Sequence, residues 1–159
     1  MVQSSLDMLE ESLIKKIEIM TRIEEENSKQ KDILSDPDNV DEEAFDKTVD
    51  AKGKYIDQLL LLDEGFQTLF DKVKSEIGDT KALYADQIKR LQALIHEITD
   101  KSASIEATEH RNKKLAEKYF SVTREKLTSG KKSASAAFSY YQNMSKSKDI
   151  PPQFLDQKN

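Results

Sequence analysis

The sequence predicts an all-α fold: an antiparallel bundle of three long helices with a short mobile C-terminal helix. Only four glycines and three prolines interrupt the 159 residues, which is too few for the frequent tight turns of an all-β domain. Apolar residues make up 36% of the chain and charged residues 35%. That balance suits long helices with narrow apolar stripes better than a broad spherical core.

The first helix is expected over residues 3–34, where apolar side chains recur at spacings of three and four. Asn27 and Lys31 interrupt this pattern. Either Asn27 is buried and fixes the register of the bundle, or the end of the helix projects into solvent. The second interpretation is the simpler one. The apolar stripe consists of Leu6, Leu9, Leu13, Ile17, Met20 and Ile23.

The second helix is expected over residues 42–77. Asp41 is a good N-cap residue, because its carboxylate can accept a hydrogen bond from a free backbone N–H of the first turn. Val40 and Phe45 have the spacing of a hydrophobic staple across that cap. At the other end, Gly78 predicts a helix terminus in the left-handed conformation.

The third helix is expected over residues 81–128, which contain neither Gly nor Pro. At 1.5 Å per residue it would outrun the second helix by about a dozen residues, so its last turns would lack an assured neighbour. Its stripe turns polar at Glu109 and Asn112, and a kink near Glu109 is the alternative to one continuous helix. The second helix likewise has polar stripe positions at Lys52 and Asp63.

The chain divides into a long-helix antiparallel bundle over residues 1–128 and a C-terminal amphipathic segment and tail over residues 129–159. Gly130 marks a change in composition. Residues 129–159 carry five basic and two acidic side chains, a net charge of +3, whereas residues 36–78 carry five and twelve, a net charge of −7. Opposite charges predict attraction between the second helix and the later segments.

Several classes of function are disfavoured. Without cysteine the chain has no disulfide framework, zinc-thiolate site or thiol nucleophile. His96 and His110 lack metal-site spacing, so we expect both at the surface, no cofactor and no enzymatic activity. The longest apolar run, 59–62, is far shorter than the ~20 residues of a membrane span. No signal peptide is visible. We expect a cytoplasmic protein that does not insert into membranes and, with a net charge of −5, does not bind nucleic acid.

Several blocks of the sequence resemble one family, the flagellar type III export chaperones of the FlgN and FliT kind. The pattern similar to the family's long central helix is Ala44-Phe45, Val49, Lys52, Ile56, Leu59, Leu62-Asp63 and Phe66. Residues 88–98 and 105–115 are similar to the family's next helix, and 133–144 to its C-terminal segment. The resemblance implies a chaperone that binds the terminal helices of hook-associated or filament-cap subunits. It would prevent their premature assembly and deliver them to the type III export apparatus.

The C-terminal region of this family commonly takes part in subunit binding. The resemblance therefore implies partner-binding roles at positions 115–122 and 138–144, and the overhang of the third helix suggests an exposed apolar face there. The candidate partner-binding residues are Leu115, Tyr119, Phe120, Val122, Phe138, Tyr141 and Met144.

Two other functions remain open at this point. The chain could be a structural coiled-coil or adaptor protein that self-associates, for instance as a homodimer, with no client helix. The lysines and aromatic residues of 129–159 could instead bind an anionic membrane surface or single-stranded nucleic acid.

Overall fold

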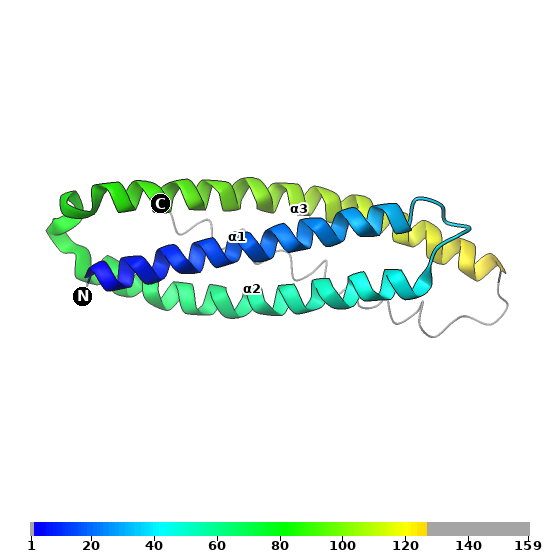
Figure 1. Ribbon diagram of the computed structural model, residues 1–159, viewed down its shortest axis with the longest axis horizontal. Helices are drawn as coiled ribbons and strands as arrows, with labels where there is room; N and C mark the ends of the chain where they lie inside the picture. The colour runs from blue at the N-terminus through cyan, green and yellow to red at the C-terminus, as the bar shows by residue number, and fades with distance from the viewer. Residues whose placement is uncertain (1, 127–159) are drawn as a thin grey trace.

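The structure is a computed structural model that describes residues 2–126. Three antiparallel α-helices, α1 (Val2–Ile33), α2 (Glu42–Ile77) and α3 (Ala85–Lys126), form the molecule, and a 3-10 helix, η1 (Gly78–Tyr84), joins α2 to α3 (Figure 1). Residues 2–126 contain no strand. The predicted all-α class with three long helices is confirmed. The predicted C-terminal helix lies outside the described residues.

The start of α2 forms as predicted. Asp41 has an extended backbone (φ −74°, ψ 98°), and its Oδ1 accepts a hydrogen bond from the backbone N–H of Ala44, with 3.1 Å between nitrogen and oxygen. Val40 packs against the apolar cluster that contains Phe45. The cap and the staple together fix the angle at which the chain enters α2.

The connection from α2 to α3 differs from the prediction. Gly78 has a φ of 46° but a ψ of −125°, so it does not adopt the left-handed helical conformation, in which both angles are near +50°. The chain continues into η1, and the hydroxyl of Thr80 donates a hydrogen bond to the carbonyl oxygen of Ile77. Because η1 uses the next residues, α3 begins at Ala85 and not at residue 81.

Helix α3 is one continuous α-helix through Glu109. The kink considered at that position is therefore not present as a break in the helix. With 42 residues in α3 and 36 in α2, the difference in length is half of what the sequence suggested. Because α3 extends less far beyond the start of α2 than expected, residues near its end can lie beside α2.

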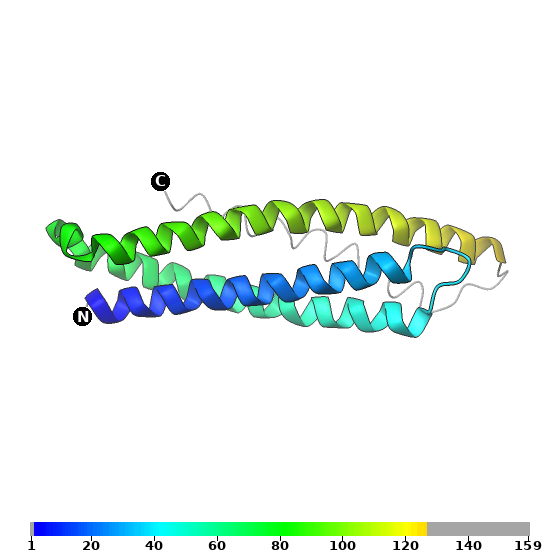
Figure 2. The ribbon, with the colours of Figure 1, turned by 45° about the horizontal axis from the view of Figure 1, so that its top comes forward.

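Helix α1 is the central element of the bundle. It packs along both α2 and α3, whereas the backbones of α2 and α3 seldom approach each other. Figure 1 shows α1 between the other two helices, and in the view of Figure 2, turned by 45°, α1 overlaps α2 below α3. The bundle is therefore stabilised mainly through the two faces of α1.

Two apolar clusters fill the bundle. The larger one, the main core, contains the N-terminal part of α1, the C-terminal part of α2 and the first half of α3. Its buried members are Leu6, Leu9, Leu13, Met20, Ile23, Leu59, Phe66, Val73, Ile77, Leu91 and Ile98. The smaller one, the distal core, lies at the other end of the bundle and consists of Leu34, Phe45, Val49, Ala116, Tyr119 and Phe120.

Candidate functional site

Five polar side chains lie between the two apolar clusters, and we call them the polar layer: Asn27 and Gln30 of α1, Lys52 of α2, and Glu109 and Asn112 of α3. All five are buried. Lys52 Nζ lies 2.6 Å from Glu109 Oε1 and donates a hydrogen bond to Gln30 Oε1 at 3.0 Å. Asn112 Nδ2 donates to the same Gln30 oxygen at 3.1 Å and to the backbone oxygen of Asn27 at 2.9 Å. The layer therefore joins all three helices.

The burial of Asn27 overturns one expectation. The interpretation that α1 projects into solvent here is wrong, because the Asn27 side chain has no exposed surface and its Nδ2 donates to Thr108 Oγ1 at 2.9 Å. Among the described residues, Asn27 Oδ1 and Gln30 Nε2 have no hydrogen-bond partner, and each such group costs about 1–3 kcal/mol. We therefore expect the layer to favour one helix register over others more than it adds stability.

A second buried ion pair lies within the main core. Lys16 Nζ of α1 is 2.7 Å from Asp63 Oδ1 of α2, and the two side chains are 2% and 14% exposed. Burial lowers the pKa of Lys16 and raises the pKa of Asp63, and the attraction between the two charges offsets only part of each shift. Both polar positions in the α2 stripe, Lys52 and Asp63, therefore have a charged partner on another helix.

Two of the predicted partner-binding residues are buried within the bundle. The ring of Phe45 contacts the rings of Tyr119 and Phe120 edge-on, with centroid distances of 5.9 and 6.1 Å. Tyr119 is 6% and Phe120 5% exposed. The expectation that these turns of α3 lack a neighbour is wrong, because η1 shortens the overhang and places them beside the start of α2.

The other predicted partner-binding residues are less constrained. Leu115 and Val122 are half-buried, and Leu115 packs against the distal core. Phe138, Tyr141 and Met144 lie outside the described residues. The partner-binding role of all seven positions stays a prediction, and for Tyr119 and Phe120 it would require the distal core to open.

A groove between α2 and α3 provides a different candidate site. It has a volume of about 490 Å³, and Leu6, Leu9 and Leu13 of α1 form its floor. Its position follows from the architecture, since α1 bridges two helices that seldom approach each other. The apolar side chains that α2 and α3 contribute to its walls are Phe66, Phe70, Val73, Ile77, Ile88, Leu91 and Ile95.

The polar side chains of this groove are few. They are Lys74, in the last turn of α2, Lys81 in η1, and Gln92 of α3, and all three are exposed. In the described part of the chain, no Asp or Glu is among the lining residues. Within residues 2–126 the groove is therefore an apolar hollow over buried main-core side chains such as Leu6, Phe66 and Leu91, with two exposed lysines at one end.

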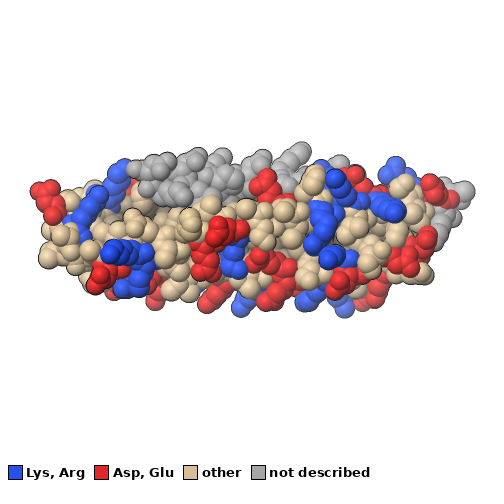
Figure 3. Space-filling model, turned by 90° about the horizontal axis from the view of Figure 1, so that it is seen from above, with Lys and Arg blue, Asp and Glu red and all other residues tan. Residues whose placement is uncertain are grey.

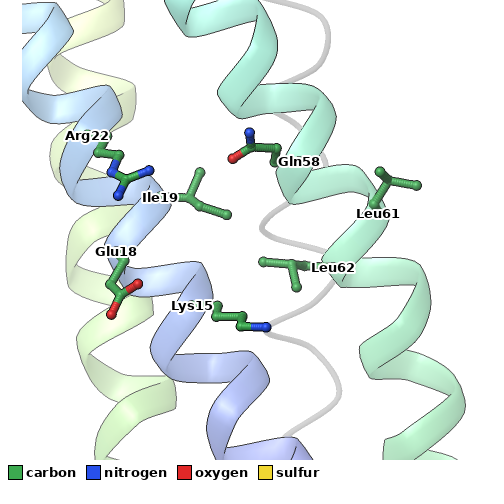
Figure 4. A pocket seen from close by; sticks show the side chains of 7 residues that line it. All are labelled: Lys15, Glu18, Ile19, Arg22, Gln58, Leu61 and Leu62. Atoms are coloured by element: carbon green, nitrogen blue, oxygen red, sulfur yellow. The ribbon is translucent and has the colours of Figure 1, made fainter.

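A second hollow, of about 410 Å³, lies between α1 and α2. Lys15 and Ile19 of α1 point toward Leu62 of α2 there, while Leu61 points away from α1 (Figure 4). This hollow has fewer apolar side chains than the groove and carries charges of both signs, because Glu18 also lines it. It is the weaker candidate for a binding site.

Other kinds of site find little support in residues 2–126. That part of the chain has no group of three His, Cys, Asp or Glu side chains placed to hold a metal ion. His96 and His110 are both exposed, as expected. On the face shown in Figure 3, basic and acidic side chains are interspersed, unlike the continuous basic surface that nucleic acid favours.

The helices of the described region contain no stretch long and apolar enough to span a bilayer.

Sequence reasoning missed the groove as a site. Apolar residues such as Leu62 and Leu69 make the apolar face of α2 wide, but a wide face does not show which part of it a neighbour leaves uncovered. The missing information was the spacing of α2 and α3, which depends on how both pack against α1.

These geometric features are the basis for assigning a function, because no protein-family model, no curated protein and no solved structure matches this chain.

Proposed function

We propose that the protein is a flagellar export chaperone and that the groove between α2 and α3 receives an amphipathic helix of its client. The observation that carries this proposal is the apolar groove of about 490 Å³ that α2 and α3 leave between them where both pack against α1. A docked helix would bury its own apolar stripe and turn the three-helix arrangement into a four-helix bundle.

The client class comes from the resemblance. It is the terminal helices of hook-associated or filament-cap subunits, which expose an apolar stripe until they assemble. Covering that stripe would prevent premature assembly before the complex reaches the type III export apparatus in the cytoplasm. The role needs no catalytic group, in agreement with the apolar lining of the groove.

The groove side chain Phe70 offers a direct test. It is half-buried in the main core and lies against Phe66, with ring centroids 6.0 Å apart. We expect the purified full chain to bind a synthetic C-terminal helix of a hook-associated subunit from the same genome with one-to-one stoichiometry. We expect Phe70→Ala to weaken binding about tenfold or more, the loss typical of an aromatic residue at the centre of an interface.

The matched control is Leu61→Ala on the same helix, because Leu61 is 70% exposed and does not line the groove. Isothermal titration with both variants, beside their melting curves, separates lost contact from lost folding. Equal affinity of Phe70→Ala and the unchanged protein would contradict docking in the groove.

The alternative, a self-associating adaptor, predicts a different result. Exposed apolar side chains such as Leu61 and Leu83 (77% exposed) would then lie between two copies of the chain. Sedimentation would show a dimer, Leu61→Ala would weaken it, and none of the subunit helices would bind.

A further inference from the structure

We infer that the groove selects client helices that carry carboxylates at the end lying over Lys74 and Lys81; this inference rests on the proposed function. Both lysines line the groove at the α2–η1 junction, and no Asp or Glu of residues 2–126 lines it with them. An apolar groove with one positive end recognises an amphipathic helix with one negative end.

The two lysines differ from the other cations that face helix–helix contacts. Lys16, Lys52, Arg90 and Lys101 each lie within 3.0 Å of a carboxylate oxygen on another helix. Within residues 2–126, neither Lys74 nor Lys81 forms an ion pair.

The nearest acidic residue of the last turn of α2 does not change this. The Glu76 side chain is half-buried and its Oε1 is 3.4 Å from Ser5 Oγ of α1, so it faces α1. Asp79 of η1 is exposed and is not among the described lining residues of the groove. Neither acid forms an ion pair with Lys74 or Lys81 within residues 2–126.

The positive charge of Lys74 and Lys81 also distinguishes between possible occupants of the groove. The chain as a whole has a net charge of −5, so a client helix that is acidic along its whole length would be repelled by most of the surface. A helix with carboxylates confined to one end avoids this repulsion and meets the two lysines in one orientation. Residues 129–159, with five basic and two acidic side chains, have the wrong sign for this end of the groove.

The test uses two designed helices with the same apolar stripe and net charge, one with Glu at one end and the other with Lys there, titrated against the full chain by fluorescence anisotropy. We expect the Glu-ended helix to bind about three- to tenfold more tightly at low salt, and the difference to shrink at high salt, because rim charges are screened. The double substitution Lys74→Glu with Lys81→Glu should reverse the preference.

The control is Lys72→Glu with Lys89→Glu. These two lysines are exposed, lie on α2 and α3 and do not line the groove. Each pair changes the net charge from −5 by four units, to −9, so both variants have the same overall charge. The control variant should keep the preference for the Glu-ended helix.

Three other outcomes would contradict either the charge selection or the proposed function. Equal binding of the two helices to the unchanged protein, or an equal effect of the two double substitutions, would overturn the charge selection and leave helix binding intact. Binding of neither helix would overturn the proposed function itself. Self-association that the Lys74 and Lys81 changes disrupt, and the control changes do not, would assign the groove to a second copy of the chain and overturn the inference.

Discussion

Lys52 of α2 and Glu109 of α3 form an ion pair, with 2.6 Å between Nζ and Oε1 and side chains that are 0% and 7% exposed. The pair links two helices whose backbones seldom approach each other. It joins them at the polar layer, between the main core and the distal core. The cation of this pair comes from α2 and the anion from α3. The net charges of the segments suggest the reverse, because α2 lies in the acidic segment.

The first prediction concerns this ion pair. Lys52→Met should destabilise the protein by about 3–5 kcal/mol, because it leaves the Glu109 carboxylate buried without its cation. The double change Lys52→Met with Glu109→Leu should recover most of that loss and could exceed the original stability by about 1–4 kcal/mol. Urea unfolding of the single and double variants gives the interaction energy. A double variant as unstable as Lys52→Met would contradict this account.

The second prediction concerns the distal core. Tyr119→Ala should lower the free energy of unfolding by about 3 kcal/mol or more, because a cavity would open beside Phe45, whose side chain is fully buried. A matched exposed position is Leu83, where a change to Ala should cost less than about 0.5 kcal/mol. An unchanged melting temperature for Tyr119→Ala would mean that this end of α3 does not pack against α2.

The third prediction concerns acid stability. Hydrogen bonds from Arg90 and Gln87 to its carboxylate hold the pKa of Glu10 below its usual 4.5. The folded state therefore binds this proton more weakly than the unfolded state. Its contribution to stability is complete above the unfolded pKa and is lost as the pH falls through the folded pKa.

Removing the guanidinium tests this linkage. Arg90→Met should make the free energy of unfolding fall less steeply between about pH 5 and about pH 3. Lys89→Met is the control, since Lys89 is exposed and has no ion pair among the described residues. An identical pH profile for both variants would show that Glu10 and Arg90 do not interact in solution.

The fourth prediction compares two glycines. A Cβ added at Gly65 would have no atom within 4 Å, so Gly65→Ala should stabilise α2 by about 1 kcal/mol through helix propensity. Gly78 has equally open space but a φ of +46°, so Gly78→Ala should destabilise the protein through backbone strain. Thermal unfolding measures both. A lower melting temperature for Gly65→Ala would indicate a close neighbour at that position.

The start of α2 was predictable from local signals. The Asp41 cap and the staple of Val40 and Phe45 needed only neighbouring residues. The start of α3 was not predictable, because whether the residues after Gly78 continue as α-helix or 3-10 helix depends on how α3 docks onto α1.

The polar layer was predictable only in part. The sequence marks Asn27, Lys52, Glu109 and Asn112 as polar interruptions of apolar stripes, yet their partners on other helices are 22 to 85 residues away along the chain. Pairing at that distance depends on the register of the helices. The same holds for Tyr119 and Phe120, whose burial follows from the length of the α2–α3 connection.

The central claim is that a client helix occupies the groove, and a single reporter in the groove tests it most directly. The chain has no cysteine, so Gln92→Cys at the groove wall and Leu61→Cys on the opposite side of α2 can each carry one environment-sensitive fluorophore. On titration with the C-terminal helix of a hook-associated subunit, the account predicts a blue shift at position 92 that saturates at one helix per chain, with no change at position 61. A shift at position 61 alone, or at neither position despite measured binding, would contradict it.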